Sequence, residues 1–160
     1  MADEIDLAEL VQTARVWGWR LTCAESCTGG MVAAAITDIP GSSDVFDRGF
    51  VTYSNAAKVE MLGVNPDTLQ AHGAVSEPVA QEMARGALAH ADANLAVSIT
   101  GIAGPGGSDH KPEGRVCFAL AQEGRPMMVE TVEFGALGRA KVRAAARDHA
   151  LRLLMQAMTR

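Results

Sequence analysis

The sequence predicts a three-layer α/β/α sandwich built on a mixed, mostly parallel β-sheet. Helical and strand patterns alternate along most of the 160 residues, and one hairpin signal appears late in the chain. Hydrophobic residues make up 48% and charged residues 21%, which is typical of a globular chain with a buried core. Because no repeat, linker or low-complexity segment interrupts the pattern, we expect residues 1–160 to form a single domain.

The first part of the chain predicts two helices and two strands in alternation. Residues 3–17 carry apolar side chains at helical spacing, with Asp3 as a candidate cap. A strand is expected around Arg20 to Ala24, followed by a small-residue helix from about Thr28 to Thr37. The β-branched and aromatic residues of Arg48 to Ser54 predict the second strand.

Three helical segments follow. A short helix is expected from Ala56 to Leu62, with Ser54 or Asn55 as its cap. Another short helical turn is expected over residues 66–72, after an Asn-Pro pair. Ser76 is the predicted cap of a longer helix with one apolar face.

The last part of the chain completes the sheet and ends in a long helix. Asn94 to Thr100 is mostly apolar and predicts a central, buried strand. Two strands around Arg115–Ala121 and Met127–Glu133 flank residues 123–126, which carry a hairpin signal. An amphipathic helix is expected from Gly138 to the end.

In sheets of this kind, ligands bind at the carboxyl ends of the strands. This rule brings together the loops that follow Ala24, Tyr53 and Thr100. These three loops hold nearly all the unusual chemistry of the sequence, so the candidate functional site is expected there.

The first loop offers two candidate nucleophiles at the predicted N-terminus of a helix. Gly29 and Gly30 let the backbone approach a ligand, and the free N–H groups there can receive an anion. The Ser26 hydroxyl needs a base to take its proton. The Cys27 thiol is its rival, because a helix N-terminus lowers a thiol pKa. A capped helix without chemistry is the alternative interpretation.

Lys58 is the better candidate for the base, because none of the four histidines has a sequence context that ties it to the site. It lies one turn into the short helix that follows the second loop. A lysine acts as a base only where burial or a neighbouring cation lowers its pKa. Tyr53 could hold this lysine or relay a proton. A solvated Lys58 and a merely packed Tyr53 stay open as alternatives.

The third loop, from Gly101 to Ser108, is rich in glycine. Its backbone N–H groups could cradle an anionic or carbonyl group, and the Thr100 hydroxyl would face the same space. Arg139 and Arg143 share one face of the last helix, so either could pair with a phosphate. A flexible surface loop and two solvated charges are the alternatives.

Charge and composition exclude several other classes of protein. The net charge is −5 without a dense basic run, which argues against a broad nucleic-acid surface. No apolar run reaches the roughly 18 residues of a membrane span. Three cysteines without a Cys-x-x-Cys pair disfavour a disulfide framework and a structural zinc site. With an acidic N-terminus unlike a signal peptide, we expect a soluble cytoplasmic protein, and a homodimer is common at this size.

Four ordered blocks of residues resemble the CinA C-terminal domain family, and the resemblance covers nearly the whole chain. The blocks are Ala24–Gly30, Gly49–Asn55 with Ala57-Lys58, Gly73–Ser76, and Thr100–Pro105 with Lys111-Pro112. Members of this family look like nicotinamide-nucleotide amidases. The resemblance therefore implies hydrolysis of the carboxamide of nicotinamide mononucleotide to nicotinic acid mononucleotide and ammonia.

The resemblance also implies roles for individual residues. It implies acyl transfer at Ser26, and so favours Ser26 over Cys27 as the nucleophile. Lys58 and Tyr53 become the activating partners, with Thr100 nearby. The residues expected to bind the nucleotide substrate are Cys27, Thr28, Gly29, Gly30, Asn55, Gly101, Ile102 and, for its phosphate, Arg143. No metal or organic cofactor is implied.

The sequence departs from the family pattern near the presumed phosphate end. Leu137-Gly138-Arg139 stands where Gly-Asp-Arg is frequent, so an acidic cap is missing before the last helix. Glu113-Gly114-Arg115 follows Pro112, where a valine and a smaller residue are more usual. Some relatives carry an additional N-terminal domain similar to molybdopterin-binding proteins, which this sequence does not contain.

A nucleotide-binding regulatory module without catalysis is the alternative function. Such a module needs the glycine-rich loops and an arginine. It has no reason to keep Ser26, Tyr53 and Lys58 together.

Overall fold

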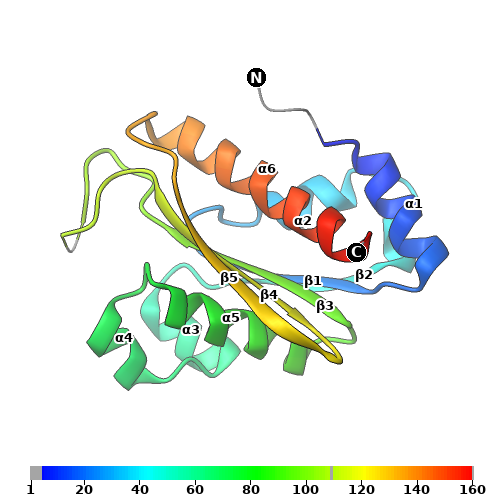
Figure 1. The fold of residues 1–160 in the computed structure, drawn as a ribbon, viewed down its shortest axis with the longest axis horizontal. Helices are drawn as coiled ribbons and strands as arrows, with labels where there is room; N and C mark the ends of the chain where they lie inside the picture. Colours follow the sequence, from blue (N-terminus) through cyan, green and yellow to red (C-terminus); the bar gives the residue numbers. More distant parts are fainter. Residues whose placement is uncertain (1–4, 109, 160) are drawn as a thin grey trace.

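The computed structural model describes residues 5–108 and 110–159 and shows a five-stranded sheet between two layers of helices (Figure 1). One face is covered by α1 (Leu7–Trp17), α2 (Met31–Thr37) and α6 (Arg139–Met158). The other face is covered by α3 (Asn55–Leu62), α4 (Pro66–His72) and α5 (Glu77–His90). The predicted three-layer α/β/α sandwich is confirmed. Every helix within the described ranges is too short or too polar to span a lipid bilayer.

The sheet is mixed, as predicted, with the strand order β2-β1-β3-β4-β5. Its strands are β1 (Leu21–Glu25), β2 (Phe46–Val51), β3 (Leu95–Gly101), β4 (Arg115–Gln122) and β5 (Arg125–Glu133). β1 pairs in parallel with both β2 and β3. β4 is antiparallel to β3 and forms the predicted hairpin with β5. The three mutually parallel strands therefore place their carboxyl ends at one edge of the sheet.

The start of α2 differs from the sequence expectation. The helix was expected from about Thr28, but it begins at Met31. Gly29 and Gly30 have φ values of +57° and +105°, which lie in the left-handed region that favours glycine. The chain between β1 and α2 is therefore a turn of five residues, 26–30, rather than the first turn of a helix.

Helix caps follow the predicted chemistry with two corrections. The predicted cap Asp3 lies outside the described residues, and the N-cap of α1 is Asp6, whose side chain accepts from the Glu9 N–H at 3.0 Å. Ser54 caps α3 as predicted, accepting from the backbone N–H three residues on. Ser76 does occupy the N-cap position of α5, but its hydroxyl donates to Gly73 O instead of capping the helix.

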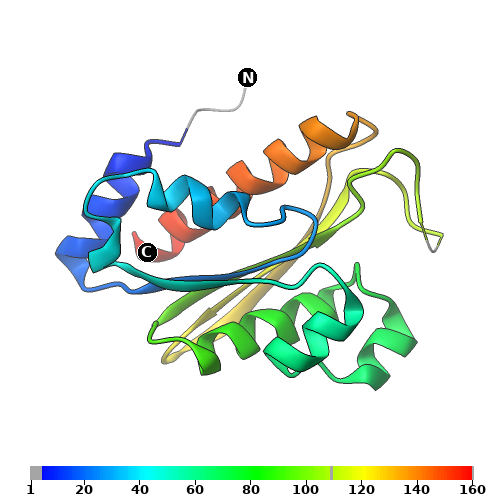
Figure 2. The same cartoon turned by 180° about the vertical axis from the view of Figure 1, so that it is seen from behind.

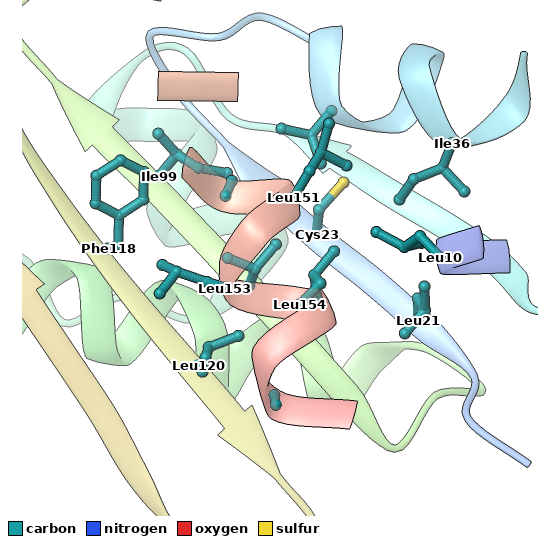
Figure 3. Packing of buried hydrophobic residues seen from close by; sticks show 14 of the residues in the cluster. Leu10, Leu21, Cys23, Ile36, Ile99, Phe118, Leu120, Leu151, Leu153 and Leu154 are labelled. Atoms are coloured by element: carbon teal, nitrogen blue, oxygen red, sulfur yellow. The ribbon is translucent and has the colours of Figure 1, made fainter. Parts of the chain in front are cut away.

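Two hydrophobic clusters fill the space between the layers. Alternate residues of β3 and β4 differ in size, with large side chains toward α6 and mostly alanine toward α5. Figure 3 shows leucines of α6 pointing toward the sheet, among Leu21, Cys23, Ile99, Phe118 and Leu120. On the α5 side the small residues allow a close approach of helix to sheet, and the Ser98 hydroxyl donates to Ala80 O at 2.6 Å.

The carboxyl edge of the parallel strands is tied together by backbone hydrogen bonds. Ser26 N donates to Ile99 O at 3.0 Å, and Thr52 N donates to Glu25 O at 2.8 Å. The long connection between β3 and β4 projects at this same edge, beside the first turn of α6 and near α4 (Figure 2). The three loops singled out from the sequence are therefore neighbours.

Candidate active site

A cavity of about 420 Å³ opens at the carboxyl edge of β1, β2 and β3. Its walls come from the loops after these three strands, the first half of α3, the residues just before α5, and the first residue of α6. Eight of the predicted site residues line it: Ser26, Cys27, Tyr53, Asn55, Lys58, Thr100, Gly101 and Ile102. Four others do not line it: Thr28, Gly29, Gly30 and Arg143.

Ser26 and Lys58 are in direct contact at the base of the site. The Lys58 Nζ donates to Ser26 Oγ at 3.0 Å, to Thr52 O at 2.9 Å and to Tyr53 O at 3.3 Å. Only 1% of Lys58 and 8% of Ser26 are exposed. The three donors of the ammonium are thus matched by three acceptors, and the only side chain among these acceptors is the serine.

Burial changes the acidity of this lysine. Loss of water around the ammonium lowers the pKa of Lys58 from 10.5 to about 8, against a smaller opposing effect of Cys27. At neutral pH roughly one molecule in ten then carries a neutral amine at this position. A neutral amine within hydrogen-bond distance of a serine hydroxyl can accept its proton.

Glu25 is a residue whose role the sequence analysis missed. Its carboxylate is fully buried and accepts from Val32 N at 3.0 Å and Ala33 N at 3.1 Å. It therefore supplies the anionic cap that Gly30, at the N-cap position of α2, cannot provide. The signal in the sequence that could have revealed this role was a single carboxylate residue at the end of a mostly apolar strand. The contact fixes the chain on both sides of Ser26.

Arg143 braces the turn that carries the nucleophile candidate. Its Nε donates to Cys27 O at 2.9 Å and its Nη2 donates to Thr28 O at 3.4 Å. A Cβ on Gly29 would come within 3.2 Å of the same Nη2 atom, so the guanidinium packs directly on this turn. The Thr28 hydroxyl is buried, and within the described residues it has no hydrogen-bond partner.

The expected activation of Cys27 is wrong. The thiol is 4% exposed, and burial raises its pKa to about 11. Because α2 begins only at Met31, Cys27 lies outside the helix whose N-terminus was expected to lower this pKa. At neutral pH the side chain is a protonated thiol.

Tyr53 and Arg139 form the mouth of the cavity. The tyrosine is 59% exposed, and its hydroxyl accepts from Arg139 Nη2 at 2.6 Å. Arg139 Nη1 donates to Gly104 O at 2.7 Å, which links the start of α6 to the glycine-rich loop. Tyr53 contacts Lys58 through its backbone carbonyl, while its hydroxyl faces Arg139.

Thr100 and Lys111 also line the cavity and tie its third loop to neighbouring segments. The Thr100 hydroxyl donates to Ala74 O at 2.9 Å. The Lys111 Nζ donates to His72 O and to Val75 O, both at 2.6 Å. Lys111 lines the cavity and was quoted in the sequence only as part of a family motif. These contacts tie the third loop to the chain between α4 and α5.

Metal ligands do not converge in the part of the chain that the structure describes. No group of three or more His, Cys, Asp or Glu side chains there could hold a metal ion. The three cysteines are free and buried.

The chain is similar to known proteins in sequence and in fold. A family model described as the CinA C-terminal domain matches residues 5–158. The nicotinamide-nucleotide amidohydrolase PncC of Enterobacter agglomerans is 60% identical over 119 residues, which are 73% of each chain. A putative competence-damage inducible protein of Symbiobacterium thermophilum is 62% identical over 109 residues, 68% of this chain and 26% of that protein.

A solved structure gives the same result at the level of the fold. The crystal structure of the competence/damage inducible protein CihA from Agrobacterium tumefaciens superposes with a TM-score of 0.91 at 44% identity, and covers 100% of both chains. The match of the family model extends from α1 to the end of α6. The chain therefore belongs to the CinA C-terminal domain family.

Proposed function

We propose that this chain is a nicotinamide-nucleotide amidohydrolase, which converts nicotinamide mononucleotide and water to nicotinic acid mononucleotide and ammonia. The buried contact between Ser26 and Lys58 carries the proposal, because it pairs a hydroxyl with a base of lowered pKa. The substrate follows from the relatives named as nicotinamide-nucleotide amidohydrolases, of which one covers 73% of this chain.

In the first half of the reaction, neutral Lys58 accepts the proton of Ser26 as Oγ attacks the carboxamide carbon. The carboxamide oxygen becomes an oxyanion that needs hydrogen-bond donors. Gly29 N already donates to Ser26 O at 3.0 Å, so the N–H groups of Cys27 and Thr28 are our candidates for these donors.

In the second half, the tetrahedral intermediate collapses and the carbon–nitrogen bond breaks. The Lys58 ammonium returns the proton to the leaving nitrogen, so that ammonia departs and a nicotinyl ester remains on Ser26. Lys58 then takes a proton from the attacking water, and cleavage of the ester releases the acid and restores the serine hydroxyl.

For the phosphate we favour Arg139 over Arg143. Arg139 lines the cavity, and its present acceptors are a neutral hydroxyl and a neutral carbonyl, which a phosphate dianion can replace. Arg143 is engaged with the carbonyls of the turn at Ser26. Tyr53 then serves by positioning Lys58 through its carbonyl and Arg139 through its hydroxyl. Cytoplasmic location and homodimer assembly stay predictions of the sequence.

The test is the release of ammonia and nicotinic acid mononucleotide from nicotinamide mononucleotide. We expect Ser26→Ala to lower kcat by roughly a thousandfold or more, since the nucleophile is removed. Cys27→Ala is the matched control, a neighbouring cavity residue with a protonated thiol, and should retain most of the activity. Ammonia release that persists in Ser26→Ala would exclude this serine. Binding of the nucleotide by the folded native chain without ammonia release would favour a regulatory module.

A further inference from the structure

The Glu113 carboxylate connects two segments that are far apart in the sequence. Its Oε1 accepts from Gly106 N at 2.7 Å, within the glycine-rich loop. Its Oε2 accepts from Gly138 N at 2.9 Å, at the N-cap position of α6. A carboxylate between two N–H donors forms charge-assisted hydrogen bonds, which are stronger than neutral ones. The side chain therefore bridges the cavity loop and the first turn of the longest helix.

Packing supports the same bridge independently of these hydrogen bonds. Gly104 has a φ of +90°, and a Cβ there would lie 2.5 Å from the Glu113 carboxyl carbon. The carboxyl group therefore lies directly against the backbone of the glycine-rich loop.

The helix end gains a negative charge from this contact. Gly138 has no side chain to cap α6, and no acidic residue lies in the first turn of this helix. The Glu113 carboxylate, reaching in from another segment, interacts favourably with the positive end of the helix. The acidic cap that is missing from the local sequence is thus supplied at a distance.

The bridge bears on Arg139, the residue that follows Gly138. Its guanidinium donates to Gly104 O at 2.7 Å and to Tyr53 OH at 2.6 Å. The loop and the helix start are therefore joined twice, once by each residue. Loss of the Glu113 link leaves the Arg139 side chain as the remaining one of these two connections, so the loop and the helix start are held less firmly.

We propose that Glu113 is a positioning residue for substrate binding, which holds the glycine-rich loop against α6 and thereby holds Arg139 at the mouth of the cavity. Glu113 is not among the described residues that line the cavity, and its carboxylate oxygens bond to Gly106 N and Gly138 N rather than to Ser26 or Lys58. Its effect is therefore on the affinity for the nucleotide and not on the chemical step. This inference rests on the proposed function for the identity of the ligand alone.

The first test needs no catalytic activity. Hydrogen exchange of the free protein is compared between Glu113→Ala and Glu133→Ala by mass spectrometry. Glu133 is a matched control, because it loses the same charge from a nearby strand and pairs only with Arg115 among the described residues. In Glu113→Ala we expect faster exchange in both residues 104–108 and residues 135–142. An unchanged rate in either segment would overturn the bridge.

The second test separates positioning from general stability. We expect Glu113→Ala to raise KM for nicotinamide mononucleotide about tenfold while kcat stays within about twofold. Glu113→Gln keeps one acceptor oxygen and should give an intermediate KM, whereas Glu133→Ala should match the native chain. An unchanged KM, or a kcat that falls together with the folded fraction, would overturn the proposal.

Failure of the proposed function is distinguishable from failure of this inference. If the native chain released no ammonia, the amidase proposal would fall, and the same variants would be compared by calorimetric Kd for nicotinamide mononucleotide. A weaker Kd in Glu113→Ala would still support the positioning role, and an equal Kd would contradict it.

Discussion

The Nζ atom of Lys58 lies 3.0 Å from the Oγ atom of Ser26, although the two residues are 32 positions apart in the sequence. Both side chains are buried, and the same burial that shields the pair lowers the pKa of the lysine to about 8. Activity and stability should therefore both depend on pH through this one group.

The pH profile of activity is the first consequence. Because only neutral Lys58 can accept the Ser26 proton, kcat/KM should rise with pH and level off above a midpoint of about 8. Ammonia release measured from pH 6 to 9.5 checks this. A midpoint near 6.5, the ordinary pKa of a histidine, would point to a different base.

The stability of the chain should depend on pH in a predictable direction. The pKa of Lys58 is lowered on folding, so the burial penalty is fully present below about pH 8 and disappears as pH rises toward 10.5. Relative to Lys58→Met, the native chain should gain about 2 to 3 kcal/mol of unfolding free energy between pH 7 and pH 10. Urea unfolding at the two pH values measures this gain. Lys141→Met, at an exposed lysine of α6, is the control and should show no comparable gain.

The buried carboxylate of Glu25 should be essential for the turn at Ser26. In Glu25→Gln an amide NH₂ group faces one of the two backbone N–H donors of α2, so one donor loses its acceptor. We expect a loss of about 2 to 4 kcal/mol in unfolding free energy, with a lower kcat in the folded protein because Ser26 is displaced. Glu9→Gln, in the exposed first turn of α1, is the matched control. Native stability in Glu25→Gln would contradict this role.

The two arginines of α6 should give different kinetic effects. Arg139→Ala should raise KM for the nucleotide about ten- to a hundredfold with a smaller change in kcat, since a charged contact to the phosphate is lost. Arg143→Ala should mainly lower kcat and stability, because the turn of Cys27 and Thr28 loses its brace. Steady-state kinetics of both variants at one pH decides between them. The reverse assignment would restore Arg143 as the phosphate ligand.

Much of the fold was predictable because it depends on local patterns. The mostly apolar run of β3, the cap at Ser54 and the Asn-Pro pair before α4 are properties of short segments. The family expected from four blocks of residues is confirmed, because the model of the CinA C-terminal domain family matches residues 5–158. The expectation that three loops meet at one edge rested on a topological rule, and it is confirmed by the common cavity.

The errors arose where a property depends on neighbours distant in sequence. The thiol of Cys27 was expected to be acidic, yet its burial in the core raises the pKa to about 11. Arg139 and Arg143 share one face of the last helix, and Arg143 was expected to bind the phosphate. The packing of α6 sets Arg139 against the glycine-rich loop and Arg143 against the turn at Ser26, which is why we propose Arg139 instead. Glu113 was noted as a departure from the family, with no indication of its partner.

The sequence by itself determined the fold class and the order of the elements, because periodicity and turn chemistry are local. It offered Ser26 and Lys58 only as candidates, and the resemblance to a family favoured Ser26 over Cys27. The tertiary structure decided which groups are dehydrated and which carbonyls or carboxylates they meet. A lysine becomes a plausible base, and a cysteine an inert thiol, only when segments far apart in the chain exclude water from them. Desolvation depends on the whole packed structure, and no single segment encodes it.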